Sequence, residues 1–121
     1  MAAKNIGDFG ENAVCDALIK RGYRILDRNF RSRFGEIDII AQDRDCIAFI
    51  EVKTRKSAKF ANACESVTFW KQQKIIKTAR YYLGENVDNE IRFDVAEVYY
   101  RQNGDKNEVL KINYFKNAFI L

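Results

Sequence analysis

The sequence predicts an α/β fold, with a mixed central sheet of about five strands flanked by α-helices. Two stretches carry apolar residues at helical spacing, and between them lie β-branched runs with the alternation typical of strands. Further alternating runs follow the second helical stretch. At 121 residues, with no proline and only six glycines, the chain shows no composition break, so we expect one domain spanning residues 1–121.

The first predicted helix covers residues 6–21, with Asn5 as its N-cap and Gly22 as its end. Glu11 lies about 20° around the helix from Leu18, so its carboxylate is expected to point toward the protein. Burying an unpaired carboxylate is costly, and a lysine, backbone donors or a metal would have to compensate it. A partly exposed acid that the helix dipole favours is the alternative.

Three strands are predicted next, over residues 23–31, 36–42 and 46–53. The turn-forming residues 43–45, Asp-Arg-Asp, join the second and third strands into an antiparallel hairpin. The sequence therefore predicts a three-stranded antiparallel meander after the first helix.

Charged residues interrupt the apolar strands of this hairpin. Glu51 and Lys53 share one face of the third strand, and the hairpin brings Asp38 of the second strand beside them. Two carboxylates this close repel each other unless a divalent cation lies between them. The pattern indicates a metal site with an adjoining lysine, and the alternative is the solvated face of an edge hairpin.

The second half of the chain predicts one helix and two more strands, after a polar loop over residues 56–65 beside the site. The helix runs over residues 67–83 and ends at Gly84. The residues expected mainly to face the core are Val67, Trp70, Ile75, Ala79, Tyr82 and Leu83. Stacking on a base is the alternative for Trp70. The strands and their hairpin turn are, in order, residues 91–99, Asn103-Gly104 and residues 109–114.

These residues form a recognisable set of motifs. The blocks are Gly10-Glu11-x-Ala13, Gly22-Tyr23-x-Ile25-Leu26-x-Arg28-Asn29, Gly35-Glu36-Ile37-Asp38, Phe49-Ile50-Glu51-Val52-Lys53-Thr54-Arg55, Val67-Thr68-x-x-Lys71-Gln72 and Arg92-Phe93-Asp94-Val95. Together they resemble the PD-(D/E)XK nuclease superfamily and, more narrowly, the bacterial YraN-like family, which is similar to archaeal Holliday junction resolvases. The resemblance covers nearly the whole chain. The proline that the superfamily carries before its first acid is replaced by Ile37.

The resemblance implies a restriction-endonuclease-like core and a metal-dependent nuclease that acts on DNA, branched or junction DNA included. Carried over to this sequence, it makes Glu11, Asp38 and Glu51 metal-binding carboxylates, with the backbone carbonyl of Val52 as a further ligand. It makes Lys53 the catalytic lysine, which orients the attacking water or stabilises the transition state. It also suggests that Lys71 and Gln72, at the start of the second helix, touch a neighbouring phosphate.

The distribution of charge favours a nucleic-acid substrate. The net charge is only +4, but basic residues concentrate in residues 20–33 and 53–80, on either side of the candidate site. Lysine and arginine clusters suit a polymer whose phosphates must be neutralised along its length. We expect Arg31, Arg33 and Arg55 to contact phosphates, whereas the lysines of the second helix have a solvated face as their alternative.

Composition excludes several other classes of site. The chain has no histidine, which rules out histidine-based catalysis and imidazole-held zinc or copper, so oxygen ligands point to Mg²⁺ or Mn²⁺ as the cofactor. Cys15, Cys46 and Cys64 are odd in number and widely spaced, so we expect reduced, structural thiols. There is no membrane-spanning run and no signal-peptide core, and we expect a cytoplasmic protein.

Two other functions stay open. The first is a catalytically silent nucleic-acid-binding module that retains the nuclease fold. The second is a docking subunit of a repair or ribosome-associated assembly. Because junction resolvases act as dimers, the resemblance also raises a homodimer, although no segment of the sequence marks its interface.

Overall fold

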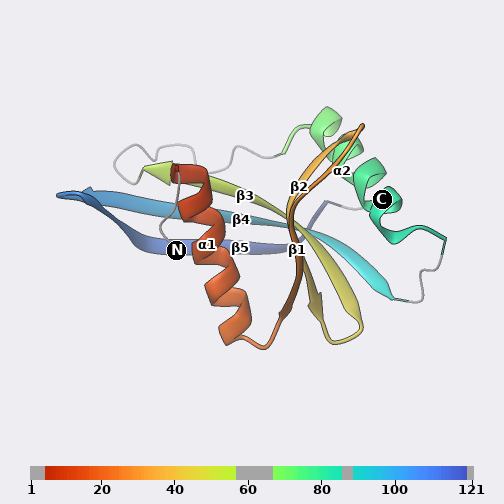
Figure 1. The fold of residues 1–121 in the computed structure, drawn as a ribbon, viewed down its shortest axis with the longest axis horizontal. Coiled ribbons are helices and arrows are strands. Elements are labelled where there is room, and N and C mark those ends of the chain that lie inside the picture. The colour runs from red at the N-terminus through yellow and green to blue at the C-terminus, as the bar shows by residue number, and fades with distance from the viewer. Residues whose placement is uncertain (1–4, 57–66, 86–88, 120–121) are drawn as a thin grey trace.

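The computed structural model describes residues 5–56, 67–85 and 89–119, and it shows a five-stranded mixed sheet with two helices (Figure 1). The elements are α1 (Ile6–Lys20), β1 (Arg24–Ser32), β2 (Gly35–Asp43), β3 (Cys46–Lys56), α2 (Phe69–Leu83), β4 (Glu90–Asn103) and β5 (Lys106–Phe119). The strand order is β1-β2-β3-β4-β5, with β3 and β4 parallel and the other neighbours antiparallel. The predicted α/β class, the meander and the mixed sheet are confirmed.

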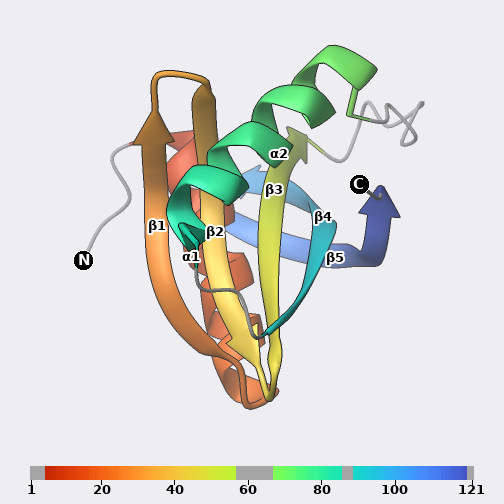
Figure 2. The ribbon, with the colours of Figure 1, turned by 90° about the vertical axis from the view of Figure 1, so that its right-hand side faces the viewer.

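The helices cover opposite faces of the sheet (Figure 2). On one face, Val14 and Leu18 of α1 pack in a cluster with Ile39 and Ile50. On the other face, residues of α2 pack in a second cluster. Its fully or nearly fully buried members include Ile37, Ile40, Phe49, Ile75, Ile76, Ala79 and Phe93. Two cores on the two faces of one sheet are the expected result of a parallel β3–α2–β4 crossover combined with an N-terminal helix on the opposite side.

Local sequence fixes the ends of both helices. The Asn5 side chain accepts a hydrogen bond from the Asp8 N–H at 2.8 Å, as its predicted N-cap role requires. Thr68 accepts from the Lys71 N–H at 3.2 Å and makes α2 begin at Phe69, two residues later than predicted. Over residues 5–56, 67–85 and 89–119, no helix combines the length and apolar character that a membrane crossing needs.

The expectation that Trp70 faces the core is wrong, because its side chain is 75% exposed. Trp70 precedes the fully buried Ala79 by nine positions, which is about 180° around an α-helix. The tryptophan therefore projects from the side of α2 that faces away from the sheet. An apolar residue type alone suggested the core, and the helical phase places it outside.

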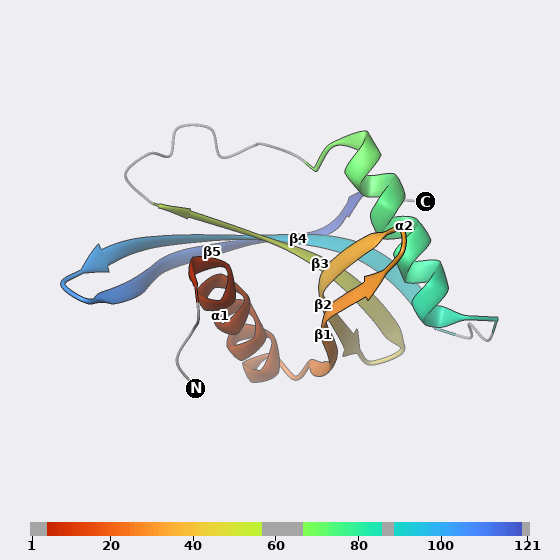
Figure 3. The same ribbon diagram turned by 45° about the horizontal axis from the view of Figure 1, so that its top comes forward.

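The last two strands are longer than predicted. They form a hairpin that extends well past α1, with its turn at Gly104 (φ +64) and Asp105, one residue on from the predicted Asn103-Gly104 turn (Figure 3). The polar residues that flank the apolar run of β5 continue the ladder with β4, as the pair Asn103–Lys106 shows. The predicted loop over residues 56–65 falls almost entirely within residues 57–66, which lie outside the described residues, and so does Cys64. Cys15 and Cys46 are free thiols.

Helix α1 lies directly on β3 at one point of contact. A Cβ atom added at Gly10 would collide with the hydroxyl oxygen of Thr54. Only a residue without a side chain allows this approach, so Gly10 sets the height of α1 above the sheet. The position of Gly10 therefore also sets the distance of the neighbouring Glu11 from the sheet.

Candidate active site

The centre of the candidate site is the point where β2 and β3 separate. Their ladder stops at the pair Ile39–Ile50, and the two strands diverge toward the β1–β2 turn (Figure 2). Just beyond that pair, Asp38 Oδ2 accepts a hydrogen bond from the Val52 N–H at 2.8 Å. The Asp38 carboxylate thus accepts the backbone N–H hydrogen bond that a carbonyl of the neighbouring strand would otherwise accept. Asp38, which interrupts an apolar run in the sequence, therefore takes part in the backbone hydrogen bonding where the two strands separate.

Glu51 lies beside Asp38 and is itself only 7% exposed. Its Oε1 is 3.5 Å from Lys71 Nζ, whereas its buried Oε2 has no hydrogen-bond partner within the described residues. Burial raises the pKa of Asp38 to about 7, helped by the hydrogen bond and the charge of Glu51, against the Val52 N–H and Lys71. Asp38 and Glu51 therefore lie side by side, and the described residues supply too few donors to satisfy both.

Glu11 approaches this pair from α1. Its side chain is 12% exposed, which confirms that it points inward, and its Oε1 is 3.5 Å from a guanidinium nitrogen of Arg28. Burial raises the pKa of Glu11, as does the charge of Asp38, while Asn29 and Arg28 lower it. Asn29 has a left-handed backbone (φ +52), a conformation that asparagine tolerates better than most residues. The compensating partner of Glu11 is thus an arginine of β1, whose only signal in the sequence is its place in a motif.

Lys53 lies two residues after Glu51 on the same face of β3 and is half-buried. In the parallel register it stands opposite Glu97 of β4, a buried acid that sequence reasoning missed. Glu97 accepts a hydrogen bond from the Tyr99 hydroxyl at 3.2 Å. The signal for Glu97 was present, because an acid interrupts the alternation from Phe93 to Tyr99 as Glu51 does in β3.

The predicted phosphate-binding residues form one group of arginines near the ends of β1 and β3 and a second group, Lys71 and Gln72, at the start of α2. Arg31 and Arg33 are exposed near the β1–β2 turn, where Arg31 forms a 3.5 Å ion pair with Glu36. Arg55 is half-buried near the end of β3. Lys71 instead reaches into the site to Glu51. The Gln72 amide donates to the Val67 carbonyl at 2.9 Å, so it holds the start of α2.

The donor set suits a hard cation, although the ligands do not form a closed cage. Among the residues that the structure describes, no three aspartate, glutamate, cysteine or histidine side chains lie close enough to hold a metal ion. Asp38 and Glu51 form a carboxylate pair with one unpartnered buried oxygen. Oxygen donors of this kind fit Mg²⁺ or Mn²⁺, with water or substrate completing the coordination. The ligand roles of Glu11, Asp38, Glu51 and Val52 stay predictions.

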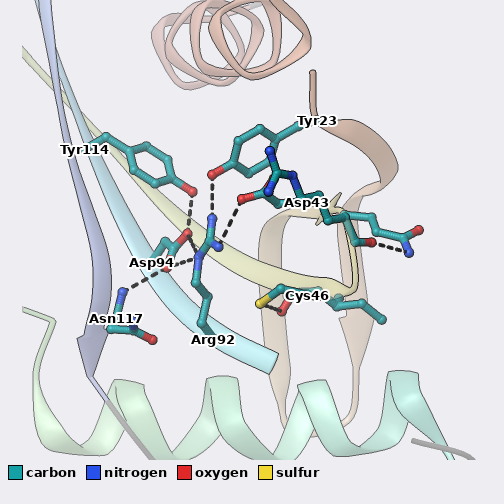
Figure 4. A network of polar contacts seen from close by, with 10 residues as sticks. Tyr23, Asp43, Cys46, Arg92, Asp94, Tyr114 and Asn117 are labelled. Atoms are coloured by element: carbon teal, nitrogen blue, oxygen red, sulfur yellow. Dashed lines mark hydrogen bonds and ion pairs between the residues drawn. The ribbon is translucent and has the colours of Figure 1, made fainter. Parts of the chain in front are cut away.

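A second polar cluster lies on the face of the sheet that α1 covers (Figure 4). Asp94 is fully buried and accepts from Arg92 Nε at 2.9 Å, from the Tyr114 hydroxyl and from the Asn117 N–H at 3.0 Å. Arg92 also donates to the Tyr23 hydroxyl and, at 3.3 Å, to Asp43. A pocket of about 1030 Å³ beside this cluster includes Tyr23 and Tyr114 in its lining but none of Asp38, Glu51 and Lys53. We assign the Arg92–Asp94 cluster a structural role.

Comparison with known proteins identifies the family. The family model described as uncharacterised protein family UPF0102 matches residues 10–98, a span that contains Glu11, Asp38, Glu51 and Lys53. A UPF0102 protein of Caldicellulosiruptor bescii is 50% identical over 122 residues, covering 98% of this chain and 100% of that protein. A UPF0102 protein of Clostridioides difficile is 46% identical over 121 residues, with 98% and 100% coverage. The chain therefore belongs to the uncharacterised protein family UPF0102.

Proposed function

We propose that this protein is a metal-dependent endonuclease that hydrolyses phosphodiester bonds in DNA, with branched or junction DNA as its substrate class. The observation that carries the proposal is the Asp38–Glu51 pair, in which the buried Glu51 has an oxygen without a partner among the described residues and shares its strand face with Lys53. The motif resemblance to the PD-(D/E)XK superfamily supports the same reading, and the basic, exposed Arg31 and Arg33 suit a phosphate backbone.

A purely structural role does not account for this pair. Placing two carboxylates together in a buried position raises the free energy of the ionised fold. A structural acid would be expected to have its donors, as Asp94 has. A carboxyl group with a strongly raised pKa, such as Asp38, next to lysines and other basic side chains is typical of functional sites.

In this mechanism Asp38, Glu51 and the Val52 carbonyl would hold Mg²⁺ or Mn²⁺, with Glu11 as a further carboxylate. When bound, such an ion activates water and offsets the negative charge of the scissile phosphate. Lys53 donates to the attacking water or to a phosphate oxygen, where charge increases in the transition state. Lys71 balances the charge of Glu51, and Arg28 pairs with Glu11 and orients its carboxylate.

The test is a cleavage panel of flap, four-way junction, single-stranded and blunt duplex DNA with Mg²⁺, Mn²⁺ or EDTA. We expect cleavage only with metal, and a loss of about 100-fold or more for Lys53→Ala with DNA affinity nearly unchanged, because binding rests on many phosphates. Asp105→Asn, an exposed acid in the β4–β5 turn, is the matched control for acid removal in Asp38→Asn and Glu51→Gln. Undiminished cleavage in EDTA would falsify the mechanism.

One observation favours a second candidate, the silent nucleic-acid-binding or docking module. The Lys71–Glu51 ion pair already supplies a counter-charge at the place where a metal would act. In that case Lys53→Ala would lower affinity and no substrate of the panel would be cut by wild-type protein with either metal. The two candidates therefore differ in whether wild-type protein cuts any DNA at all, and not merely in how fast it does so.

A further inference from the structure

The outward face of α2 combines exposed aromatic and basic side chains. Trp70, Lys74, Lys77 and Tyr81 are spaced by four, three and four residues, so they form one stripe along the helix. All four are exposed, and Trp70 and Tyr81 are 75% and 65% accessible. The stripe spans about 16 Å at 1.5 Å per residue. Large aromatic rings rarely stand this far into solvent on a face that only keeps a helix soluble.

The charge of α2 has one sign. The helix carries Lys71, Lys74, Lys77 and Arg80 and not one acidic residue. Phe69 is 65% exposed beside Trp70, with the ring centroids 6.0 Å apart. An unbalanced row of cations with rings between them suits a polyanion that offers flat apolar faces, whereas a second copy of this chain would bring the same cations against themselves.

The tip of the β1–β2 hairpin extends this surface. It is fixed to α2 by a 3.0 Å hydrogen bond between the hydroxyls of Ser32 and Thr78. Phe34 lies next to two cations, with the Arg33 guanidinium 5.0 Å and the Lys77 amine 5.9 Å from its ring centroid. Arg33, which we expect to contact phosphate, thus belongs to the same basic and aromatic surface as α2.

This surface also reaches the candidate active site. Lys71 follows Trp70 directly in the chain and places its amine 3.5 Å from Glu51. In Figure 1, α2 runs close to the β1–β2 turn on the side where β2 and β3 separate. A strand lying along the stripe would therefore arrive beside Asp38, Glu51 and Lys53.

We propose that the outer face of α2 binds an unpaired DNA strand, with bases stacking on Trp70 and Phe69 and phosphates meeting Lys74 and Lys77. Unpaired bases expose their faces, whereas those of a duplex are covered by their neighbours, so the aromatic rings select single-stranded segments. As a route into the active site, this proposal rests on the proposed nuclease function. The preferred substrate is then DNA with a single-stranded arm next to the cleaved bond.

Trp70 provides a direct readout, because it is the only tryptophan of the chain. Intrinsic fluorescence is titrated with oligothymidine, with an abasic oligomer of equal length and with blunt duplex, all in EDTA. We expect oligothymidine to quench Trp70 strongly, while the abasic oligomer binds through its phosphates with little quenching. Equal quenching by all three ligands, or none by oligothymidine, would overturn the stacking proposal.

Variants separate stacking from charge, with affinity measured on a labelled oligonucleotide. Trp70→Ala should weaken oligothymidine binding roughly 5- to 100-fold and abasic binding much less. Phe115→Ala, which removes a 47% exposed ring from β5, is the matched control and should change neither. Joint Lys74→Gln and Lys77→Gln should weaken both ligands and reduce the salt slope by about 0.7 for each phosphate that is no longer neutralised. If Trp70→Ala binds like Phe115→Ala but changes the oligomeric state, the surface is an interface between copies and the proposal fails.

The two proposals fail in different ways. Quenching and its loss are measured without metal, so they test the surface even if no substrate is ever cut. If wild type cleaves and Trp70→Ala keeps the same ratio of flap to duplex cleavage, the nuclease proposal stands and the surface is wrong. If oligothymidine quenches Trp70 and no DNA is cleaved with either metal, the surface stands and the nuclease proposal is wrong.

Discussion

Asp94 and Glu51 are buried acids of one sheet, and they differ in how well their oxygens are hydrogen-bonded. Asp94 is fully buried and accepts from an arginine, a tyrosine and a backbone N–H. Glu51 is nearly as buried, yet one of its oxygens has no partner in the described part of the chain. Burial alone therefore does not distinguish Asp94 from Glu51. The supply of donors does.

The two clusters also differ in the electrostatic state that the fold prefers. Burial opposes the charge of Arg92, but the hydrogen bond and charge of Asp94 outweigh it and raise the pKa of Arg92. Burial, followed by Asp94, likewise raises the pKa of Tyr114, which stays a neutral donor. At Asp38 burial and Glu51 act together against ionisation. The first cluster is stable with its charges, and the second is destabilised by them.

Removing a charge from the first cluster should produce the largest change. Arg92→Ala leaves Asp94 buried without its counter-charge, so we expect the free energy of unfolding to fall by about 3–5 kcal/mol, as for other broken buried pairs. The measurement is denaturant unfolding by circular dichroism. Arg101→Ala, which breaks an exposed pair with Glu108, is the control and should cost at most about 1 kcal/mol. Equal losses for the two variants would contradict a structural role of the Arg92–Asp94 cluster.

The same kind of change in the second cluster should have the opposite sign. Asp38→Asn keeps an acceptor for the Val52 N–H and removes the repulsion with Glu51, so metal-free protein at pH 8 should gain about 1–3 kcal/mol. The measurement is the thermal midpoint in EDTA, beside a cleavage assay in which the variant should be inactive. A less stable Asp38→Asn protein would remove the distinction between the two clusters.

The pH dependence of stability gives a smaller, directional test. The folded-state pKa of Asp38 is raised from its ordinary 3.8 to about 7, so the folded state holds a proton that the unfolded chain releases. This contribution to stability is complete below pH 4 and is lost as pH rises from about 4 to about 7. The difference in thermal midpoint between wild type and Asp38→Asn should follow that course in EDTA. A difference that stays constant across this window would contradict the shifted pKa.

Glu11→Gln should give the smallest change in stability. The pKa of Glu11 is raised by burial and by Asp38, but the variant also deprives Arg28 of its ion pair, so metal-free stability should rise less than for Asp38→Asn. If Glu11 is a ligand, Mn²⁺ affinity should fall roughly 10-fold, read from the thermal midpoint across a Mn²⁺ titration. Superimposable shifts for wild type and variant would take Glu11 out of the metal site.

The fold was largely predictable because its signals are local. Helical spacing, the Asn5 cap, and the turns at Arg44 and Gly104 lie within a few residues of the elements they define. Trp70 was placed wrongly because residue type was given more weight than helical phase. The extent of β5 depends on pairing with β4, which a polar sequence does not reveal.

The candidate site was predictable only in part. Asp38, Glu51 and Lys53 interrupt apolar strands, which makes them visible in the sequence. The Lys71–Glu51 contact spans the crossover from β3 to α2, and its only signal was the motif resemblance at Lys71. Arg92 lies only two residues from Asp94, but the other two donors of Asp94, Tyr114 and Asn117, come from β5, and no local pattern reveals them. Local sequence patterns did not reveal the contacts between residues that lie far apart in the chain.

Gly10 shows how a missing side chain can specify the position of a charged one. Intrinsic propensity favours alanine over glycine inside a helix by about 1 kcal/mol, so a scan for stabilising substitutions would select Gly10→Ala first. The hydroxyl of Thr54 fills the space that this methyl group needs, and α1 would have to lift away from β3 together with Glu11. Residues 10 and 54 therefore constrain each other's size: a relative with a larger residue at the first position needs a smaller one at the second to keep its helix seated.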